Sequence, residues 1–349
     1  MPEALRDGVC RLSHLGVIRA QGADAAKFLH GQLTNDFALL RPDQARLAAL
    51  CSPKGRMLAS FIGFKRASDD ILLLCSTDLL PATLKRLSMF VLRAQCKLSD
   101  ASAEWAVWGL SGEAVERAAR ASTAATASTT STADGAPWSV LATDRGTLVR
   151  LYPADGVARA LCVSDAAAAH AAPQGPAIAE DVWLWSEVRS GVARITQPVV
   201  EAFVPQMLNY ESVGGVNFQK GCYPGQEVVA RSQFRGTLKR RAYRVHIDGA
   251  ENTDAAALLA ACAPGTEIFH SSDAEQPVGE LAQSAASPGS AASATLPRGG
   301  VDAIACLTVS AVSETSPASP ADVGSLHVGS ATGPVLRVES LPYPLRDDI

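Results

Sequence analysis

The chain has 349 residues, 47% of them hydrophobic and 19% charged, with a formal net charge of −4. These values predict a globular protein with two or three domains and exclude a disordered chain. The small negative charge gives no sign of a polyanionic partner for the molecule as a whole. No apolar run approaches the roughly 20 residues needed to span a bilayer, and the acidic N-terminus lacks the apolar core of a signal peptide. We therefore expect a cytoplasmic protein with no membrane partner.

The first half of the sequence alternates patterns typical of strands and helices. A strand over residues 15–19 is followed by a helix that begins near residue 22 and continues to residue 33. Further strands are expected at residues 47–50, 57–64, 71–75, 105–110 and 147–152, and further helices at residues 81–91 and 111–120. This order predicts an α+β fold with two related modules built on antiparallel sheets.

The second half contains a different pattern. After residue 241, short apolar runs alternate with Gly and Pro turns, at residues 243–247, 278–281, 301–308 and 335–338. This alternation predicts a small C-terminal β-barrel. Four stretches rich in Ala, Ser and Pro have too little apolar area to offset the entropy of ordering, so we expect surface loops at residues 121–136, 166–177, 283–297 and 313–321.

The eight cysteines are widely scattered and form no Cys-x-x-Cys pair, which argues against a disulfide framework or a structural zinc site. Cys75 and Cys306 lie in apolar runs, so they are expected to be packing residues. Cys51 precedes a turn that contains Lys54, which makes it a weaker candidate for a reactive thiol. The six histidines are isolated in sequence, and no metal-binding motif accompanies them.

The run KGCYPGQE at residues 220–227 carries the most chemical information. It places the Cys222 thiol beside the Lys220 ammonium group and just before a helix that is predicted to start after Pro224 and Gly225. A neighbouring cation and the positive end of a helix both favour the thiolate, so Cys222 is the first candidate for a reactive residue. The other interpretation is a tight corner in which Cys222 only packs.

Residues 203–241, FVPQMLNYESVGGVNFQKGCYPGQEVVARSQFRGTLKRR, resemble the signature region of the YgfZ-type folate-binding proteins, which are relatives of the glycine-cleavage T-protein, an aminomethyltransferase. Further blocks that resemble this family lie at residues 15–36, 51–57, 183–191 and 341–343. The resemblance implies a three-domain ring with a folate pocket at its centre and the Lys-Gly-Cys motif close to that pocket.

The expected domains follow from this resemblance. Residues 1–46 and 181–240 would form a discontinuous folate-binding α+β domain that carries the Lys-Gly-Cys motif. Residues 47–180 would form the second α+β domain, and residues 241–349 the C-terminal β-barrel.

The resemblance also implies residues of the folate site. The family's aromatic residue that lines this site matches Trp183, whose ring would suit stacking on a pterin, although a core tryptophan is the other interpretation. A partner position, aromatic in some relatives, falls on Leu15, which would make stacking from that side weaker. The position where relatives often present a glutamate to the pterin falls on Arg189.

One difference from the T-protein branch bears on whether the chain catalyses aminomethyl transfer. That branch carries an acidic pair after its glycine turn, and one of these residues serves the folate-dependent transfer. Here Arg56 and Met57 follow Gly55. Because a missing general acid-base group typically costs about 10²- to 10⁴-fold in rate, aminomethyl transfer is disfavoured.

A basic stretch follows the motif. Between residues 231 and 244 the sequence has six basic residues and no acid: Arg231, Arg235, Lys239, Arg240, Arg241 and Arg244. It could be a solvated face, an anchor for the glutamyl tail of folate, in which Arg231 and Arg235 could share a carboxylate, or a contact for RNA. No recognised RNA module accompanies it, so direct nucleic-acid binding is the weakest of the three.

The resemblance implies a role in the assembly or repair of iron–sulfur clusters, which supports enzymes such as those that thiomethylate tRNA. Tetrahydrofolate would be the cofactor, with a transient iron–sulfur cluster as a further one, and iron–sulfur and cluster-assembly proteins would be partners. We assign Cys222 as the redox-active or cluster-ligating thiol and Lys220 as the group that holds it ionised. The residues that support this motif are Gly221, Tyr223, Gly225, Gln226 and Glu227. The alternatives are a folate-dependent one-carbon transferase and an RNA-associated scaffold.

Overall fold

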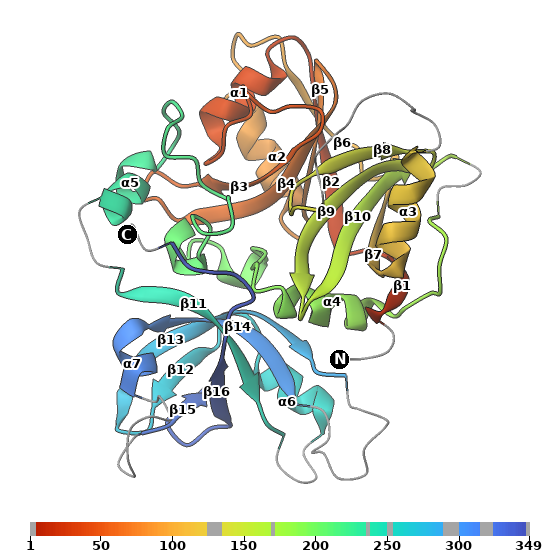
Figure 1. The fold of residues 1–349 in the computed structure, drawn as a ribbon. Helices are drawn as coiled ribbons and strands as arrows, with labels where there is room; N and C mark the ends of the chain where they lie inside the picture. Colours follow the sequence, from red (N-terminus) through yellow and green to blue (C-terminus); the bar gives the residue numbers. More distant parts are fainter. Residues whose placement is uncertain are drawn as a thin grey trace.

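The computed structural model describes residues 5–123, 135–168, 172–234, 238–249, 254–288, 300–314 and 324–346. These residues form two five-stranded sheets and a closed six-stranded barrel, and all of the strand pairs in them are antiparallel (Figure 1). The α+β fold class and the C-terminal barrel predicted from the sequence are confirmed. No helix among the described residues is long and apolar enough to cross a membrane.

The first sheet has the strand order β3-β4-β5-β2-β6. Its strands are β2 (Leu15–Gln21), β3 (Ala45–Cys51), β4 (Met57–Ala67), β5 (Asp70–Ser76) and β6 (Lys97–Asp100), and its helices are α1 (Ala25–Gln32) and α2 (Leu80–Ser88). All seven residues of β5 are buried. A central strand that is covered on both faces requires such a nearly continuous apolar sequence, so the run predicted as a buried strand takes the middle of the sheet.

The second sheet has the order β1-β7-β10-β9-β8. Its strands are β1 (Asp7–Arg11), β7 (Trp105–Gly112), β8 (Val140–Thr143), β9 (Gly146–Ala154) and β10 (Val157–Asp165), and α3 (Glu113–Thr123) packs on it. The two N-terminal strands therefore separate, because β1 joins the second sheet and β2 joins the first.

This pairing bears on the expected domain boundaries. The boundary between residues 46 and 47 falls inside β3, and β2 on one side of it pairs with β5 on the other, with Leu15 opposite Ser76. The expected boundary thus cuts the first sheet, because hydrogen-bonded strands lie on both sides of it. The full division of the chain into domains stays a prediction.

The barrel closes in the order β11-β14-β13-β12-β15-β16. Its strands are β11 (Arg240–Ile247), β12 (Glu267–His270), β13 (Asp273–Ala286), β14 (Val301–Thr308), β15 (Leu326–Val328) and β16 (Val335–Glu339), with helices α6 (Ala255–Ala261) and α7 (Val309–Glu314). Strand β13 continues to Ala286, so the loop expected from residue 283 begins later than predicted. The described residues of the stretch 166–177 lie in no helix or strand, as expected. Helix α3 extends into the stretch 121–136 and α7 into the stretch 313–321, and most other residues of these two stretches lie outside the described residues.

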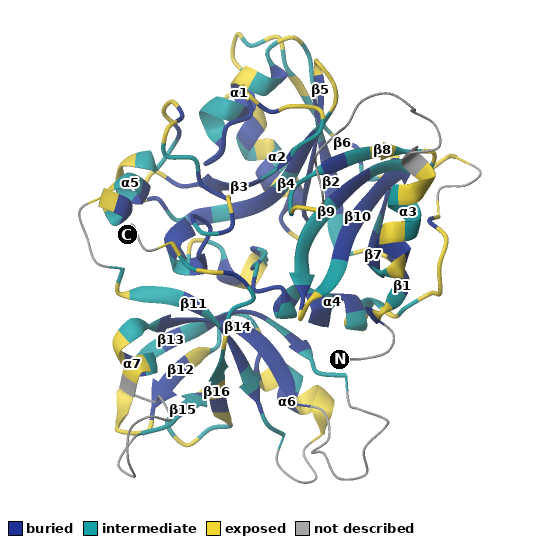
Figure 2. Cartoon of the chain, viewed as in Figure 1, coloured by how far each residue is buried: buried dark blue, intermediate teal, exposed yellow. Residues whose placement is uncertain are grey.

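The helix α4 (Glu180–Arg189) connects the sheets to the barrel. It contacts β1 and β9 on one side and β13 and β14 on the other (Figure 1). After it, the chain runs through two short 3-10 helices, Gln197–Val199 and Pro205–Leu208, to α5 (Gln226–Phe234). Figure 2 shows that the strands are largely buried, whereas the outer faces of α3, α5 and α6 are exposed.

Ion pairs reinforce this connection. Arg189 at the end of α4 pairs with Asp155 in the turn between β9 and β10, and with Glu339 at the end of β16. Arg244 of β11 donates to the same Asp155 carboxylate at 2.7 Å. Burial opposes ionisation of Asp155, but the hydrogen bonds from Arg189 and Arg244 hold its pKa below its usual value. Asp155 is thus the shared anion between the second sheet, α4 and the barrel.

Replacing Asp155 with Asn is expected to lower the free energy of unfolding at pH 7 by about 1 to 3 kcal/mol, because two largely buried guanidinium groups lose a counter-ion. The folded-state pKa of Asp155 is lowered, so its contribution is complete above the unfolded-state pKa of about 3.9 and is lost as the pH falls through the folded-state pKa. Urea unfolding of the parent and the variant should therefore show a gap at pH 7 that narrows at pH 3. Asp144→Asn, at an aspartate whose side chain is 56% exposed, is the control and should change little. A gap of equal size at both pH values would contradict the assignment.

Candidate functional site

Sequence blocks that lie far apart in the chain meet beside α5. The Thr34 hydroxyl donates a hydrogen bond to the Gly215 carbonyl at 2.7 Å, and the Asn217 amide donates to the Thr34 carbonyl at 3.0 Å. The Asn35 side chain donates to the Gly214 carbonyl at 2.6 Å. The N-terminal block is therefore fixed to the segment that leads into the Lys-Gly-Cys loop.

Two glycine turns pack against each other at this place. Gly225 has a φ of +81°, and a Cβ added to it would lie 2.4 Å from the Ser52 carbonyl oxygen. Gly55 has a φ of +71°, and a Cβ there would lie 2.8 Å from the Cβ of Val228. Both positions need glycine, because of their backbone conformation and because of the close approach. The turn at Pro224–Gly225 and the helix that starts at Gln226 are as predicted.

The ammonium group of Lys220 fixes the loop from within. Lys220 is 8% exposed, and its Nζ donates to the carbonyls of Leu33 at 3.0 Å and of Gly221 at 3.2 Å. It also lies 4.5 Å from the centroid of the Tyr223 ring. Burial lowers the pKa of Lys220 to about 8, although the Asp36 carboxylate opposes this shift. The hydrogen bonds of Lys220 therefore go to backbone carbonyls, and its effect on the Cys222 sulfur is electrostatic.

Cys222 differs from the other cysteines by its exposure. It is exposed, whereas Cys96 is half-buried and the remaining six cysteines are buried. Burial raises the pKa of the thiols of Cys51, Cys75 and Cys306 to about 12. Cys75 and Cys306 are packing residues as predicted, and the possible reactive role of Cys51 is wrong because its thiol is sealed in the core. The interpretation of Cys222 as a packing residue does not hold either.

A histidine that sequence reasoning passed over borders this loop. His30 Nδ1 lies 3.0 Å from Asp36 Oδ1, and a Cβ added to Gly221 would lie 3.4 Å from His30 Nε2. Burial opposes ionisation of Asp36, but hydrogen bonds from the Leu39 amide and from His30 hold its pKa below its usual value. The available signal was the position of His30 inside the N-terminal block, six residues before Asp36. Because no motif surrounds His30 in the sequence, its proximity to the Lys-Gly-Cys loop was not predicted.

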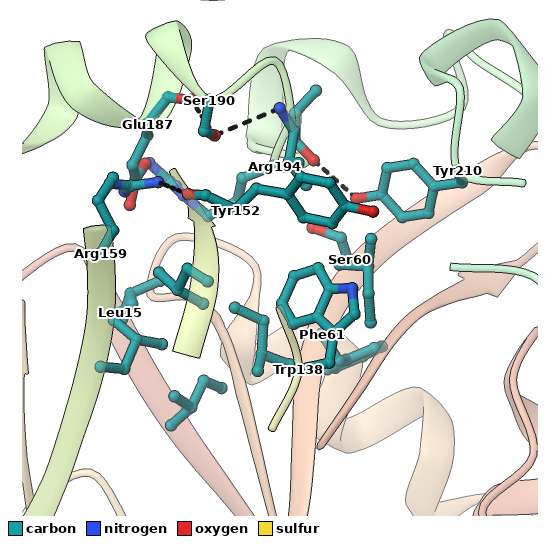
Figure 3. A pocket seen from close by; sticks show the side chains of 17 residues that line it. Leu15, Ser60, Phe61, Trp138, Tyr152, Arg159, Glu187, Ser190, Arg194 and Tyr210 are labelled. Carbon is teal, nitrogen blue, oxygen red and sulfur yellow. Dashed lines mark hydrogen bonds and ion pairs between the residues drawn. The ribbon is translucent and has the colours of Figure 1, made fainter. Parts of the chain in front are cut away.

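A second feature is a pocket between the two sheets (Figure 3). We call it the inter-sheet pocket. It is lined by residues of both sheets, of α4 and of the segment after α4: Leu15, Leu47, Ser60, Phe61, Ile62, Leu74, Trp138, Leu151, Tyr152, Arg159, Leu161, Glu187, Ser190, Val192, Ala193, Arg194 and Tyr210. Most of these side chains are apolar or aromatic, and three are charged. Apolar walls with a few polar groups are typical of a small-molecule site.

The aromatic wall of the pocket was not predicted. The rings of Trp138 and Tyr152 meet edge to face, with centroids 5.9 Å apart. Trp138 has a φ of +68°, and its indole nitrogen donates to the Val213 carbonyl at 2.8 Å. A positive φ is unusual for such a bulky residue and is often held at functional sites. The Val213 contact also links the pocket to the segment that continues into the Lys-Gly-Cys loop.

The three charged groups have different surroundings. The Glu187 carboxylate accepts hydrogen bonds from His14, Trp183, Arg194 and Gln283. Burial opposes its ionisation, but the Arg194 guanidinium and the His14 ring hold its pKa well below its usual value. Glu187 therefore stays ionised and is saturated with donors. It lies one helical turn after Trp183 on α4, which is the signal that could have indicated it.

Arg159 is less well paired. It is 4% exposed, and its Nη1 donates to the Tyr152 carbonyl at 3.5 Å. Its guanidinium carbon lies 4.4 Å from the centroid of the Trp183 ring. Its Nε and Nη2 have no hydrogen-bond partner. Burial lowers its pKa to about 10, so it remains charged at neutral pH.

The residues predicted to bind the cofactor do not come together. Leu15 lines the inter-sheet pocket. Trp183 does not, because it is fully buried behind Arg159, and a Cβ added to Gly109 would lie 2.6 Å from its ring. The predicted stacking of Trp183 on a pterin is therefore wrong for this arrangement, and it is a core tryptophan. Arg189 serves the ion pairs with the barrel instead of the pocket.

The Lys-Gly-Cys loop and the pocket are also separate, since none of residues 220–227 lines the pocket. The expected closeness of the motif to the pocket is not found. Arg231 is exposed and pairs with Glu227 along α5, and Arg235 lies outside the described residues. Further along the basic stretch, Arg241 pairs with Glu211, and Arg244 pairs with Asp155. These arginines are bound to carboxylates of the protein itself.

Comparisons with known proteins place this architecture. Residues 4–137 match the family model described as the GCVT N-terminal domain. A protein of Hamiltonella defensa named tRNA-modifying protein YgfZ is 28% identical over 245 residues, which cover 69% of this chain and 70% of the relative. The protein of that name from Edwardsiella ictaluri is 33% identical over 229 residues, which cover 64% and 66%. Aminomethyltransferase T of the glycine cleavage system of Bartonella henselae superposes with a TM-score of 0.61 at 16% identity, covering 97% of this chain and 86% of that protein.

The fold is therefore that of the aminomethyltransferase-like proteins, in which two antiparallel sheets precede a β-barrel. Within that class the chain is similar to the proteins named tRNA-modifying protein YgfZ, and the resemblance read from the sequence is confirmed.

Replacing Gly225 with Ala tests the contact between the two glycine turns. The variant is expected to lose about 1 to 3 kcal/mol of unfolding free energy, because a Cβ there is strained and overlaps the Ser52 carbonyl. Gly221→Ala is the matched control in the same loop, since Gly221 has no positive φ and a Cβ there meets only His30 Nε2, at 3.4 Å. Chemical unfolding should separate the two variants. Equal stability of both would contradict the close packing of the turns.

Proposed function

We propose that this protein is a tetrahydrofolate-binding factor for the assembly or repair of iron–sulfur clusters. It would support cluster enzymes, including those that thiomethylate tRNA, through the thiol of Cys222. The observation that carries the proposal is that the exposed cysteine stands on a loop built by three of the sequence blocks that match the family. The name of the relatives, tRNA-modifying protein YgfZ, supports a link to tRNA modification.

The inter-sheet pocket would receive the folate. Its walls are mostly apolar or aromatic and carry a few charged groups, which is the composition usual for small-molecule sites. Trp138 and Tyr152 would pack against the planar pterin, and Arg159 offers buried donors without partners. The bound tetrahydrofolate would supply a carrier for a one-carbon unit.

The thiol chemistry falls to the residues of the loop. Lys220 holds the backbone of the loop in place and contributes a positive charge close to the sulfur. His30 is oriented by Asp36 with its Nε2 towards the loop, so it would accept the thiol proton of Cys222. The resulting thiolate faces solvent, where it could act as one ligand of a cluster whose other ligands come from a partner protein.

A one-carbon transferase is the alternative that the GCVT match favours. The arrangement of charges disfavours it. Arg56, at the position of the missing acidic pair, donates to the Ala202 carbonyl and has a structural role. Glu187 lines the pocket, but its low pKa and its four donors leave it unsuited to proton transfer near neutral pH.

Cys222→Ala in cells that lack the native protein tests the function. The variant should fail to restore tRNA thiomethylation, measured by mass spectrometry of modified nucleosides, while its thermal unfolding and folate affinity stay those of the parent. Both should persist because Cys222 is exposed and lies outside the pocket. Cys96→Ser, at the half-buried cysteine, is the control and should restore modification. Full restoration by Cys222→Ala would disprove the role of the thiol.

His30→Gln tests the proton acceptor. Alkylation of Cys222 by iodoacetamide at pH 7, followed by peptide mass spectrometry, should be slower in the variant, because the thiol proton loses its acceptor. The difference from the parent should shrink at high pH, where hydroxide removes the proton. His327→Gln, at a barrel histidine, is the control. Equal alkylation rates of His30→Gln and the parent at pH 7 would exclude His30 from this role.

A further inference from the structure

The other arginines of this protein show what the free atoms of Arg159 are suited to bind. Arg19 donates from Nε and Nη2 to the two carboxylate oxygens of Asp70, at 2.9 Å each. Arg41 binds Asp43 in the same way, at 3.0 and 2.7 Å, and Arg189 binds Asp155 at 2.8 and 3.2 Å. The fork of Nε and Nη2 thus grips two adjacent acceptor atoms in each case.

In Arg159 the same fork is free. Its Nε and Nη2 are buried and unpartnered, on a residue that is 4% exposed. Figure 3 shows the side chain among the pocket residues, between Leu15 and Glu187. Unpaired buried donors cost stability, more so when the group is charged. Arg159 lines the pocket, so its unpaired donors lower the stability of the protein at a place that a ligand could reach. This combination indicates that the partner of these donors lies outside the chain.

The charges of the pocket support the same conclusion. Its lining includes two guanidinium groups, those of Arg159 and Arg194, and one carboxylate, that of Glu187. Glu187 forms an ion pair with Arg194 at 3.4 Å, whereas its charge acts on Arg159 from a greater distance. The Nε and Nη2 atoms of Arg159 are therefore left without an acceptor, which favours an electron-rich group on the ligand.

We infer that Arg159 is a specificity-determining residue of the inter-sheet pocket, where its Nε/Nη2 fork binds two adjacent hydrogen-bond acceptors of the ligand. This inference rests on the proposed folate function. Folic acid offers such acceptors in two places, at the O4/N5 edge of the oxidised pterin and at its carboxylates, and tetrahydrofolate keeps O4 and the carboxylates. Arg159 thereby selects ligands that accept hydrogen bonds at this position over isosteric ligands that donate there.

Binding of four probes to the full chain tests the inference by calorimetric titration. Folic acid carries both acceptor groups, pterin carries only the ring edge, and p-aminobenzoylglutamate carries only the carboxylates. Aminopterin replaces O4 with an amino group, which donates. Arg159→Met should weaken folic acid binding by about 10- to 100-fold, the loss of a charged two-point hydrogen bond. Arg159→Lys keeps the charge but not the fork, so it should lose affinity as well.

The pattern among the probes identifies the acceptor. If the fork binds the ring edge, Arg159→Met weakens pterin and leaves aminopterin nearly unchanged. If the fork binds the carboxylates, the variant weakens p-aminobenzoylglutamate and aminopterin. Arg150→Met, at an arginine of β9 that pairs with Glu116 outside the pocket, is the control and should bind as the parent does.

The ligand-free protein gives an independent readout. Without ligand, Arg159→Met should unfold at the same temperature as the parent or a higher one, because it no longer buries unpaired donors. A lower unfolding temperature together with unchanged folic acid affinity would show a structural arginine and overturn the inference. Equal folic acid affinity of the parent and Arg159→Met would overturn this inference and leave the proposed folate function intact. A parent that binds none of the probes overturns the folate function with it.

Discussion

The structure depends on the close approach of two glycine turns that are about 170 residues apart in sequence. The backbone of Gly225 packs closely against the Ser52 carbonyl, and Gly55 packs against Val228 in the first turn of α5. This contact, together with the Lys220 ammonium on the Leu33 carbonyl, joins the loop to the first sheet. The exposed thiol of Cys222 therefore rests on a rigid base. Rigid backbone beneath an accessible side chain is what a residue that meets a partner requires.

The loop and the pocket differ in their electrostatic design. In the loop, each charge is matched within the chain: Lys220 meets two carbonyls, and Asp36 meets His30 and a backbone amide. In the pocket, four donors fill the acceptor positions of Glu187, while Nε and Nη2 of Arg159 have no acceptor. The loop is thus complete without a ligand, and the pocket is not. The contact between Trp138 and the Val213 carbonyl is a physical connection between the two.

Sequence periodicity predicted the elements whose signal is local. The apolar run of β5 and the Pro-Gly turn before α5 specify their own conformation, so both were placed correctly. Strand β1 was missed because it is short and its partner β7 lies about a hundred residues away. The roles of Trp183 and Arg159 were out of reach for a similar reason. Arg159 of β10 separates Trp183 from the pocket. No local sequence pattern indicates which of two side chains far apart in sequence lines the pocket.

The separation of β1 from β2 constrains how the chain can fold during synthesis. β2 cannot pair until β5 has left the ribosome, and β1 must wait for β7, whose Gly112 stands opposite Asp7. The first twenty residues therefore emerge as two unpaired strands that belong to different sheets. Bringing together such distant partners carries a loop-closure cost that slows folding. Nascent chains of this protein consequently expose sheet edges over a long stretch of translation, when chaperone binding would protect them most.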